Sequence, residues 1–284
     1  MIVVTGASGQ LGRLVIHSLL KRIPASQIVA AVRNPASVAD LAQLGVQVRQ
    51  ADYNQPASLV SAFAGAQKLL LISSSEVGQR VAQHAAVITA AKQAGVELLA
   101  YTSLLRADSS PLGLAAEHQQ TEQLIRDSGL AHVILRNGWY TENYLAAIPA
   151  ALAHGVLLGS AGEGRIASAA RADYAEAAAV VLTTPQPANV IYELAGDEAY
   201  TLSQLAEEVS KVSGKAVVYQ DLPEAEYSAA LQDAGLPEGL ARLLADSDRG
   251  VSQGWLFDGS HQLSALIARP TTAWRSLVTE AVKG

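Results

Sequence analysis

Hydrophobic residues along the first half of the chain form short uninterrupted runs, separated by stretches in which they recur at helical spacing. In the first intervening stretch, Leu11, Leu14, Val15 and Leu19 mark one apolar helix face. Strands that are apolar throughout are typical of a sheet covered on both faces. The runs that predict strands are 2–5, 28–32, 46–50, 68–72, 98–102 and 132–136.

The junctions between helices and strands repeat one local pattern. The segments AQLGVQV, KQAGVEL and DSGLAHV each place a helix end, a glycine and the start of an apolar strand in the same order. Gly45, Gly95 and Gly129 are therefore predicted to end helices in the left-handed conformation. Repeated helix-to-strand junctions predict an α/β fold of the Rossmann type, with a doubly wound parallel sheet.

The pattern changes after about residue 150. Residues 157–175, LLGSAGEGRIASAARADYA, are rich in Gly, Ser and Ala and predict either a hairpin or a mobile loop. Helical segments then dominate: TLSQ at 201–204 has the form of a capping box, and SGKAVVYQ predicts another short strand. We expect a Rossmann domain over 1–150, to which the chain returns around 165–200, and a smaller, mostly helical domain over 151–284.

Composition narrows the classes of function. The chain has 284 residues, of which half are hydrophobic and 16% are charged, and its formal net charge of −6 argues against nucleic-acid binding. No apolar run approaches the ~20 residues of a membrane-spanning helix. Cysteine is absent, which excludes disulfides, thiolate catalysis and cysteine-ligated zinc and favours a reducing cytoplasm. The six histidines are scattered without an HExxH pair, so we expect no metal site. Because a strand is predicted directly after Met1, we also expect no secretory signal.

Three glycines lie between the first predicted strand and the first predicted helix. In a dinucleotide fold, Gly6 would permit the tight turn, Gly9 would let the backbone approach a pyrophosphate, and Gly12 would let the helix pack against the strand. The start of that helix would offer unpaired N–H groups to the phosphates. The alternative is a glycine-rich turn that binds nothing, which the strand–turn–helix context disfavours.

Arg33 occupies the end of the second predicted strand. An acidic residue that binds a free ribose 2′-hydroxyl is common at this place, but the sequence there is IVAAVRNP, with no carboxylate nearby. A guanidinium suits a 2′-phosphate instead, so the sequence predicts NADPH over NADH. The alternative is a surface arginine without a binding role.

Three further stretches follow predicted strands, where ligands bind in open α/β sheets. Ser73–Ser75 would either contact the cofactor ribose or cap a helix before Val77, and Thr102 and Ser103 follow the next strand. The segment RNGWYTENY, at 136–144, gathers three aromatic residues in a chain with 5% aromatics. These rings would lie beside a flat substrate or anchor the helical region on the sheet.

Several of these segments together resemble the NmrA-like group of atypical short-chain dehydrogenases, and within it the zinc-free bacterial NAD(P)H:quinone oxidoreductases. The resemblance is carried by TGASGQLG, the arginine of VRNP, LLLISSSEVGQR, YTSLL, LRNGWYTENY and RADYA. It implies two-electron reduction of a quinone in the cytoplasm, with NADPH as cofactor, NADH as the weaker alternative, and neither metal nor flavin. The cofactor-binding residues that it implies are Gly6, Ala7, Ser8, Gly9, Gln10, Leu11, Gly12, Arg33, Ser73, Ser74, Ser75, Asn137, Gly138, Trp139, Tyr140, Thr141 and Glu142.

One departure from the wider dehydrogenase pattern bears on mechanism. None of the nine tyrosines is followed four residues later by lysine, so the pair that passes a proton to a carbonyl is missing. A quinone needs less acid catalysis, and hydride could pass directly to a ring held beside Tyr140, Asn143 and Tyr144, in a cleft between the two expected domains. His118 is a candidate proton donor, although a solvated histidine on a helix face is the favoured interpretation.

Some choices stay open at this stage. The missing Tyr/Lys pair also suits a regulator of the NmrA type that senses NADP(H) without catalysis. Asp173 is expected to cap a helix over 174–182, whereas Arg171 and the 159–164 stretch would either contact ligand or serve structure. The sequence allows a homo-oligomer and does not identify the physiological acceptor.

Overall fold

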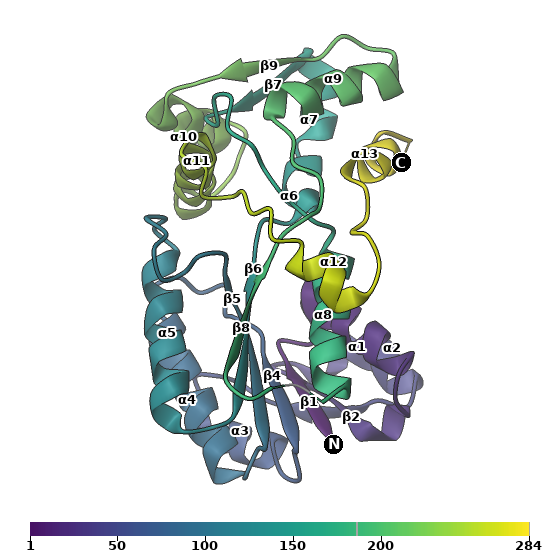
Figure 1. Cartoon of the computed structure of the whole chain (residues 1–284), viewed down its shortest axis with the longest axis vertical. Coiled ribbons are helices and arrows are strands. Elements are labelled where there is room, and N and C mark those ends of the chain that lie inside the picture. Colours follow the sequence, from purple (N-terminus) through teal and green to yellow (C-terminus); the bar gives the residue numbers. More distant parts are fainter. Residues whose placement is uncertain (186, 284) are drawn as a thin grey trace. The chain divides into compact units, whose positions relative to one another are not determined.

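The computed structural model describes residues 1–185 and 187–283 and divides into two compact units (Figure 1). Unit 1 comprises Met1–Ala107, Ala116–Asn137 and Arg171–Tyr192, and unit 2 comprises Asp108–Ala115, Gly138–Ala170 and Glu193–Gly284. The expected boundary at residue 150 thus falls inside unit 2, and of the segment around 165–200 that was expected to return to the first domain, Arg171–Tyr192 lies in unit 1. No helix in the described part of the chain is long and apolar enough to cross a membrane.

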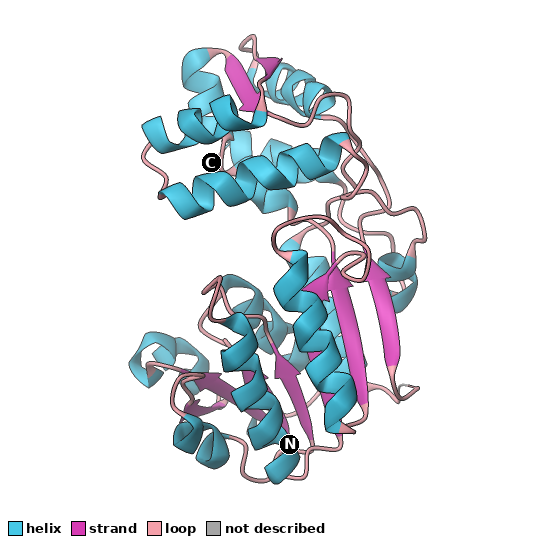
Figure 2. Cartoon of the chain, turned by 90° about the vertical axis from the view of Figure 1, so that its left-hand side faces the viewer, coloured by secondary structure: helices cyan, strands magenta, loops and turns pink. Residues whose placement is uncertain are grey.

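A seven-stranded sheet forms the centre of unit 1, and the last of its strands along the chain ends at Leu194, just beyond that unit's last residue, Tyr192. The strand order is β3-β2-β1-β4-β5-β6-β8, and the β1–β2, β2–β3, β1–β4, β4–β5 and β5–β6 ladders are parallel. Figure 2 shows strands of this sheet as magenta arrows with helices beside them. This arrangement confirms the predicted doubly wound sheet. The strands are β1 (Ile2–Thr5), β2 (Ile28–Val32), β3 (Gln47–Gln50), β4 (Lys68–Leu71), β5 (Leu98–Leu104), β6 (His132–Asn137) and β8 (Val190–Leu194).

Helices cover both faces of this sheet, as the apolar strands require. One face packs on α3 (Pro56–Ala62), α4 (Arg80–Gln93) and α5 (Ala115–Ser128), whose buried side chains share a core with β1, β2, β4, β5 and β6. On the opposite side lie α1 (Gln10–Leu20), α2 (Ala39–Gln43) and α8 (Arg171–Thr183), and α1 packs along α8 (Figure 1). Two short 3₁₀ turns, Ala25–Gln27 and Pro35–Val38, flank β2.

The predicted helix-to-strand junctions adopt the expected backbone. Gly45, Gly95 and Gly129 have φ of +85°, +72° and +74°, which places all three in the left-handed region. Glycine is the residue that adopts this region at little cost, so the three repeats were a reliable signal for βα units.

Unit 2 is mostly helical, with one two-stranded parallel sheet of β7 (Val156–Gly159) and β9 (Val218–Asp221). The predicted capping box is present, because Thr201 and Gln204 bond each other's backbone N–H at the start of α9. The helices of this unit are α6 (Thr141–Leu145), α7 (Ile148–His154), α9 (Leu202–Ser213), α10 (Glu224–Asp233), α11 (Glu238–Ser252), α12 (Gln262–Ile267) and α13 (Trp274–Lys283).

The Gly/Ser/Ala-rich stretch forms neither a hairpin nor an unsupported loop. Its first residues are β7, which pairs in parallel with β9 rather than with a neighbour in sequence. The loop that follows donates three backbone N–H groups to side chains: Ser160 to Asp248 Oδ2 at 3.0 Å, Ala161 to the Tyr219 hydroxyl at 3.0 Å, and Gly162 to an Asp221 oxygen at 2.8 Å. The hairpin alternative is therefore wrong, and the backbone of the loop is hydrogen-bonded to acceptors distant in sequence.

The expected cap at Asp173 is also wrong. Helix α8 begins at Arg171, so Asp173 is its third residue and is fully buried. A carboxylate inside the first turn favours the helix through the partial positive charge of its N-terminus, without serving as the cap residue.

Candidate functional site

The turn between β1 and α1 depends on its glycines in two physical ways. Gly6 has φ of +60°, a conformation that side-chain-bearing residues rarely adopt. A Cβ added to Gly12 would lie 2.4 Å from the Gly6 carbonyl oxygen and 2.7 Å from the Ala7 Cα, so only hydrogen fits there. Gly9 is less confined, because its added Cβ would meet only the Gly6 oxygen, at 3.3 Å.

The start of α1 offers hydrogen-bond donors and lacks negative charge. Its N-cap is Gly9, no described side chain caps the helix, and its first turn holds no acidic residue. The first N–H groups of a helix have no partner within it and carry a partial positive charge. The turn therefore fits an anionic group such as a diphosphate, with main-chain amides as donors.

Thr5 and Tyr53 fix the strand ends beneath this turn. The Tyr53 hydroxyl donates to Thr5 Oγ1 at 2.6 Å and also lies 3.0 Å from the Ile72 carbonyl, while Thr5 Oγ1 lies 3.0 Å from the Leu70 carbonyl. The Ile72 N–H donates back to Thr5 Oγ1 at 3.2 Å. Burial raises the pKa of Tyr53, which stays a neutral donor. These contacts tie the glycine turn to the segment that follows β4.

Arg33 follows β2, and its side chain is 71% exposed. Its Nη1 lies 2.9 Å from Glu76 Oε1, and Glu76 comes from the segment after β4. The sequence around Arg33 contains no carboxylate, but the parallel topology supplies one from another strand end. Sequence reasoning missed Glu76 because residues 43 positions apart give no local signal.

Protein groups fix the backbone of Ser73–Ser75. The Ser73 N–H donates to Thr102 Oγ1 at 2.9 Å, the Ser74 N–H donates to His84 Nε2 at 3.0 Å, and Arg80 Nε donates to the Ser74 carbonyl at 2.5 Å. Helix α4 begins only at Arg80, so these serines do not cap it. The structure thus brings Gly6–Gly12, Arg33 and this serine segment together at the carboxyl ends of β1, β2 and β4.

The hydrogen bond from Ser74 fixes the tautomer of His84. Because Nε2 accepts from a backbone N–H, the ring proton lies on Nδ1, which donates to Thr121 Oγ1 at 2.9 Å. Burial, assisted by the charge of Arg80, lowers the pKa of His84 to about 3. The neutral ring is therefore a stable acceptor for this segment.

His118 is not the solvated histidine that was expected. Its side chain is buried on α5, and Nδ1 lies 2.7 Å from the Tyr101 hydroxyl. Burial, with the neighbouring charge of Arg80, lowers the pKa of His118 to about 3. A histidine that is neutral near pH 7 and bonded to a core tyrosine is a poor general acid.

The two histidines give a testable pH dependence. Both have native pKa values near 3, below the ordinary value of 6.5, so the unfolded chain binds more protons between these limits. Unfolding free energy is therefore expected to fall as pH falls below 6.5, with the full contribution present above it. His118→Gln should lose less stability than the unmodified chain between pH 7 and 5, as measured by urea unfolding at each pH. An equal loss of unfolding free energy in the variant and the unmodified chain would contradict the lowered pKa of His118.

The remaining predicted residues lie around the end of β6. Asn137 ends this strand in unit 1, and its buried Oδ1 has no hydrogen-bond partner among the described residues. Gly138–Glu142 belong to unit 2. Within unit 2, the rings of Trp139 and Tyr144 are buried with centroids 6.5 Å apart, so these two aromatics pack against each other inside that unit.

Tyr144 does not present its hydroxyl to solvent. The hydroxyl donates to Asp248 Oδ1 at 2.9 Å, and both side chains are buried. Burial raises the pKa of Asp248 to about 6, and sequence patterns gave no hint of this residue. Tyr140 and Asn143 are half-buried, so of the three substrate-positioning candidates these two keep accessible surface.

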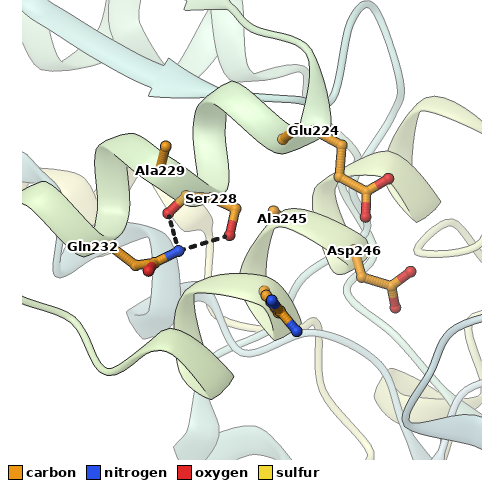
Figure 3. A pocket seen from close by; sticks show the side chains of 8 residues that line it. Glu224, Ser228, Ala229, Gln232, Ala245 and Asp246 are labelled. Atoms are coloured by element: carbon orange, nitrogen blue, oxygen red, sulfur yellow. Dashed lines mark hydrogen bonds between the residues drawn. The ribbon is translucent and has the colours of Figure 1, made fainter.

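Unit 2 contains a recess of about 620 Å³ between α10 and α11 (Figure 3). Gln232 Nε2 lies 3.3 Å from the Ser228 carbonyl, and Glu224 lies 2.9 Å from Arg249. Asp246 accepts from the Gly113 N–H at 2.9 Å. The polar groups here are paired with neighbours, and none of the sequence-predicted residues lines this recess.

Taken together, the doubly wound parallel sheet and the glycine turn between its first strand and first helix define a Rossmann-type protein, and the uncapped start of α1 fits an anionic group. In the described part of the chain, no group of three or more His, Cys, Asp or Glu residues is placed to hold a metal ion. The model of the NmrA-like family matches residues 1–253, and the chain belongs to this family.

Individual relatives match over almost the whole chain. Quinone oxidoreductase 2 of Escherichia coli (strain K12) is 62% identical over 272 residues, which cover 96% of this chain and 95% of that protein. The crystal structure of the E. coli NADPH-dependent quinone oxidoreductase complexed with NADPH matches with a TM-score of 0.96, 61% identity and 99% coverage of both chains. Triphenylmethane reductase of Citrobacter sp., complexed with NADP(H), matches with a TM-score of 0.95 and 41% identity, covering 99% of this chain and 100% of its own.

Proposed function

We propose that this protein is an NADPH-dependent quinone oxidoreductase. The observation that carries the proposal is the 62% identity, over 96% of the chain, to a quinone oxidoreductase. The matched crystal structure with NADPH supports the same cofactor. The uncapped start of α1 and the exposed guanidinium of Arg33 support it independently, because they fit a diphosphate and a 2′-phosphate.

The proposed binding roles follow the chemistry of each group. The main chain of Gly6–Gly12 would hold the diphosphate, Arg33 the 2′-phosphate, and Ser73–Ser75 the ribose beside it. Asn137, at the end of β6, extends the proposed cofactor site within unit 1, and a role for Gly138–Glu142 in unit 2 stays a prediction of the family resemblance. The buried Oδ1 of Asn137 is an acceptor with no partner among the described residues, which suits a ligand donor.

The protein contributes orientation rather than acid–base catalysis in this proposal. NADPH, when bound, supplies a hydride to the acceptor. The chain has no Tyr-x-x-x-Lys pair, and His118 is neutral and bonded to Tyr101, so solvent is the proton source for the reduced quinone oxygens. Tyr140 and Asn143 are the proposed substrate-positioning residues, whereas the buried Tyr144, whose hydroxyl donates to Asp248, is not proposed to contact the substrate.

A direct assay tests the activity. The absorbance of NADPH is followed after addition of a small benzoquinone or naphthoquinone, and cofactor binding is measured separately by calorimetry. We expect turnover well above the background rate without protein. Bound NADPH without turnover would favour a non-catalytic regulator that senses NADP(H), and no heat with either nucleotide would overturn the dinucleotide site itself.

Replacing Arg33 tests the cofactor preference. Arg33→Ala removes a charge-assisted pair to the 2′-phosphate, which is worth about 1.5–3 kcal/mol, so NADPH affinity should fall about tenfold to a hundredfold. NADH lacks this phosphate and should lose little affinity. Dissociation constants for both nucleotides give the ratio, and an unchanged ratio would remove Arg33 from the site.

Two further features belong to the same proposal. The enzyme would work in the cytoplasm, in keeping with the absence of cysteine from the sequence. Its partner would be a small quinone, and the negative net charge of −6 disfavours nucleic acid.

A further inference from the structure

The guanidinium of Arg33 faces a carboxylate that belongs to the same surface of unit 1. Arg33 Nη1 lies 2.9 Å from Glu76 Oε1, and the two side chains are 71% and 40% exposed. If Arg33 binds the 2′-phosphate, as the proposed function holds, an acidic group stands directly beside that phosphate. This inference rests on that role of Arg33.

Glu76 is held in this position by the surrounding protein. Its second oxygen, Oε2, accepts from Gln83 Nε2 at 2.8 Å, and the Gln83 side chain is almost fully buried. The Glu76 N–H donates to Ser74 Oγ at 3.1 Å, and the Ser74 backbone is fixed in turn by His84 and Arg80. One carboxylate oxygen is therefore anchored, and the other is directed toward Arg33.

The geometry has opposite consequences for the two nucleotides. A 2′-phosphate must share Arg33 with Glu76 and experiences repulsion from its negative charge. A free 2′-hydroxyl can instead donate to a carboxylate, which is the contact that favours NADH in dinucleotide folds. We propose that Glu76 is a specificity-determining residue that weakens NADPH binding and supports NADH binding, so that Arg33 and Glu76 together set the cofactor ratio.

The size of the effect follows from exposure. Exposed charge pairs contribute up to about 1 kcal/mol, which corresponds to about fivefold in affinity. Glu76→Gln keeps the length of the side chain and a carbonyl oxygen for Gln83 but removes the charge. We expect this variant to bind NADPH about two- to fivefold more tightly and NADH several-fold more weakly, which raises the NADPH/NADH affinity ratio by roughly tenfold.

The test is calorimetric titration of the full-length chain with NADPH and NADH, for the unmodified protein and Glu76→Gln. Glu97→Gln is the matched control, because Glu97 is exposed and precedes β5, at the edge of the parallel sheet opposite the residues that follow β4. It removes the same charge and should leave both affinities unchanged. Glu76→Asp keeps the charge and should retain more NADH binding than Glu76→Gln.

Each outcome separates this inference from the proposed function. If Arg33→Ala strongly lowers the NADPH/NADH affinity ratio while Glu76→Gln leaves this ratio unchanged, Glu76 does not affect cofactor specificity and the inference is wrong. An equal change in Glu97→Gln would also overturn it, because the effect would then be net charge alone. If Arg33→Ala itself leaves the ratio unchanged, the proposed role of Arg33 fails. Urea unfolding of Glu76→Gln checks that the variant is folded.

Discussion

Gly12→Ala is expected to reduce NADPH affinity by more than about a hundredfold and to destabilise unit 1. The added Cβ would lie 2.4 Å from the Gly6 oxygen and 2.7 Å from the Ala7 Cα, both of which are backbone atoms. Neither can rotate away, so α1 must move from the turn. Overpacking of this kind costs about 1–3 kcal/mol, and displaced donors lose the alignment that a diphosphate requires. Calorimetry gives the affinity, and urea unfolding gives the stability.

Two other glycines make this result interpretable. Gly9→Ala meets only one atom, at 3.3 Å, so it should lower affinity with little loss of stability if the diphosphate approaches at Gly9. Gly239→Ala, on α11, is the control, because the added Cβ meets open space. It should leave the NADPH affinity unchanged and should not lower the free energy of unfolding. A Gly12→Ala protein that binds NADPH normally would show that the close approach does not matter.

Glu122→Gln is expected to destabilise the protein by about 3–5 kcal/mol, because it leaves the Arg136 guanidinium buried without its carboxylate. Glu122 and Arg136 are 2% and 4% exposed and form two contacts, at 2.9 and 2.8 Å. Ser103 Oγ also donates to Glu122, at 2.6 Å. The carboxylate therefore joins α5 to β5 and β6, and urea unfolding measures its loss.

A double variant distinguishes the loss of the ion pair from the cost of leaving one buried charge without its partner. Glu122→Leu combined with Arg136→Met removes both charges and should be more stable than Glu122→Gln alone. If the double variant were the less stable of the two, the pair itself would supply the net stabilisation. Arg13 and Asp40 provide a comparison on the surface of unit 1, where Asp40→Asn should cost little.

The parts of the fold that could be predicted are those that depend on local physics. Apolar runs predicted the strands because helices cover both faces of the sheet. Consecutive residues of a strand such as β2, including Val29 and Ala30, are therefore all buried. Gly45, Gly95 and Gly129 marked helix ends because few residues adopt positive φ. The capping box at Thr201 was visible because both partners lie within one turn.

The parts that could not be predicted depend on contacts between distant residues. The sequence shows His118 as a polar residue on a helix, which predicts an exposed side chain. In the structure the ring is buried, and its Nδ1 lies within hydrogen-bond distance of the Tyr101 hydroxyl, a partner distant in sequence. The 159–164 stretch has the composition of a loose loop, yet Asp248 and Tyr219 supply acceptors for its backbone. Glu76 was missed for the same reason, because the topology rather than the sequence neighbourhood brings it to Arg33.

The discontinuity of unit 1 has a consequence for synthesis. Helix α1, which begins at the glycine turn, packs along α8, and Lys68 Nζ donates to the Leu182 carbonyl at 2.8 Å. A ribosome must therefore release the chain past Thr183, including the whole 138–170 insertion, before α1 acquires α8 as its neighbour. A nascent chain stopped at residue 150 would lack α8 and would leave the side of α1 that faces α8 in water, where exposed apolar surface favours aggregation.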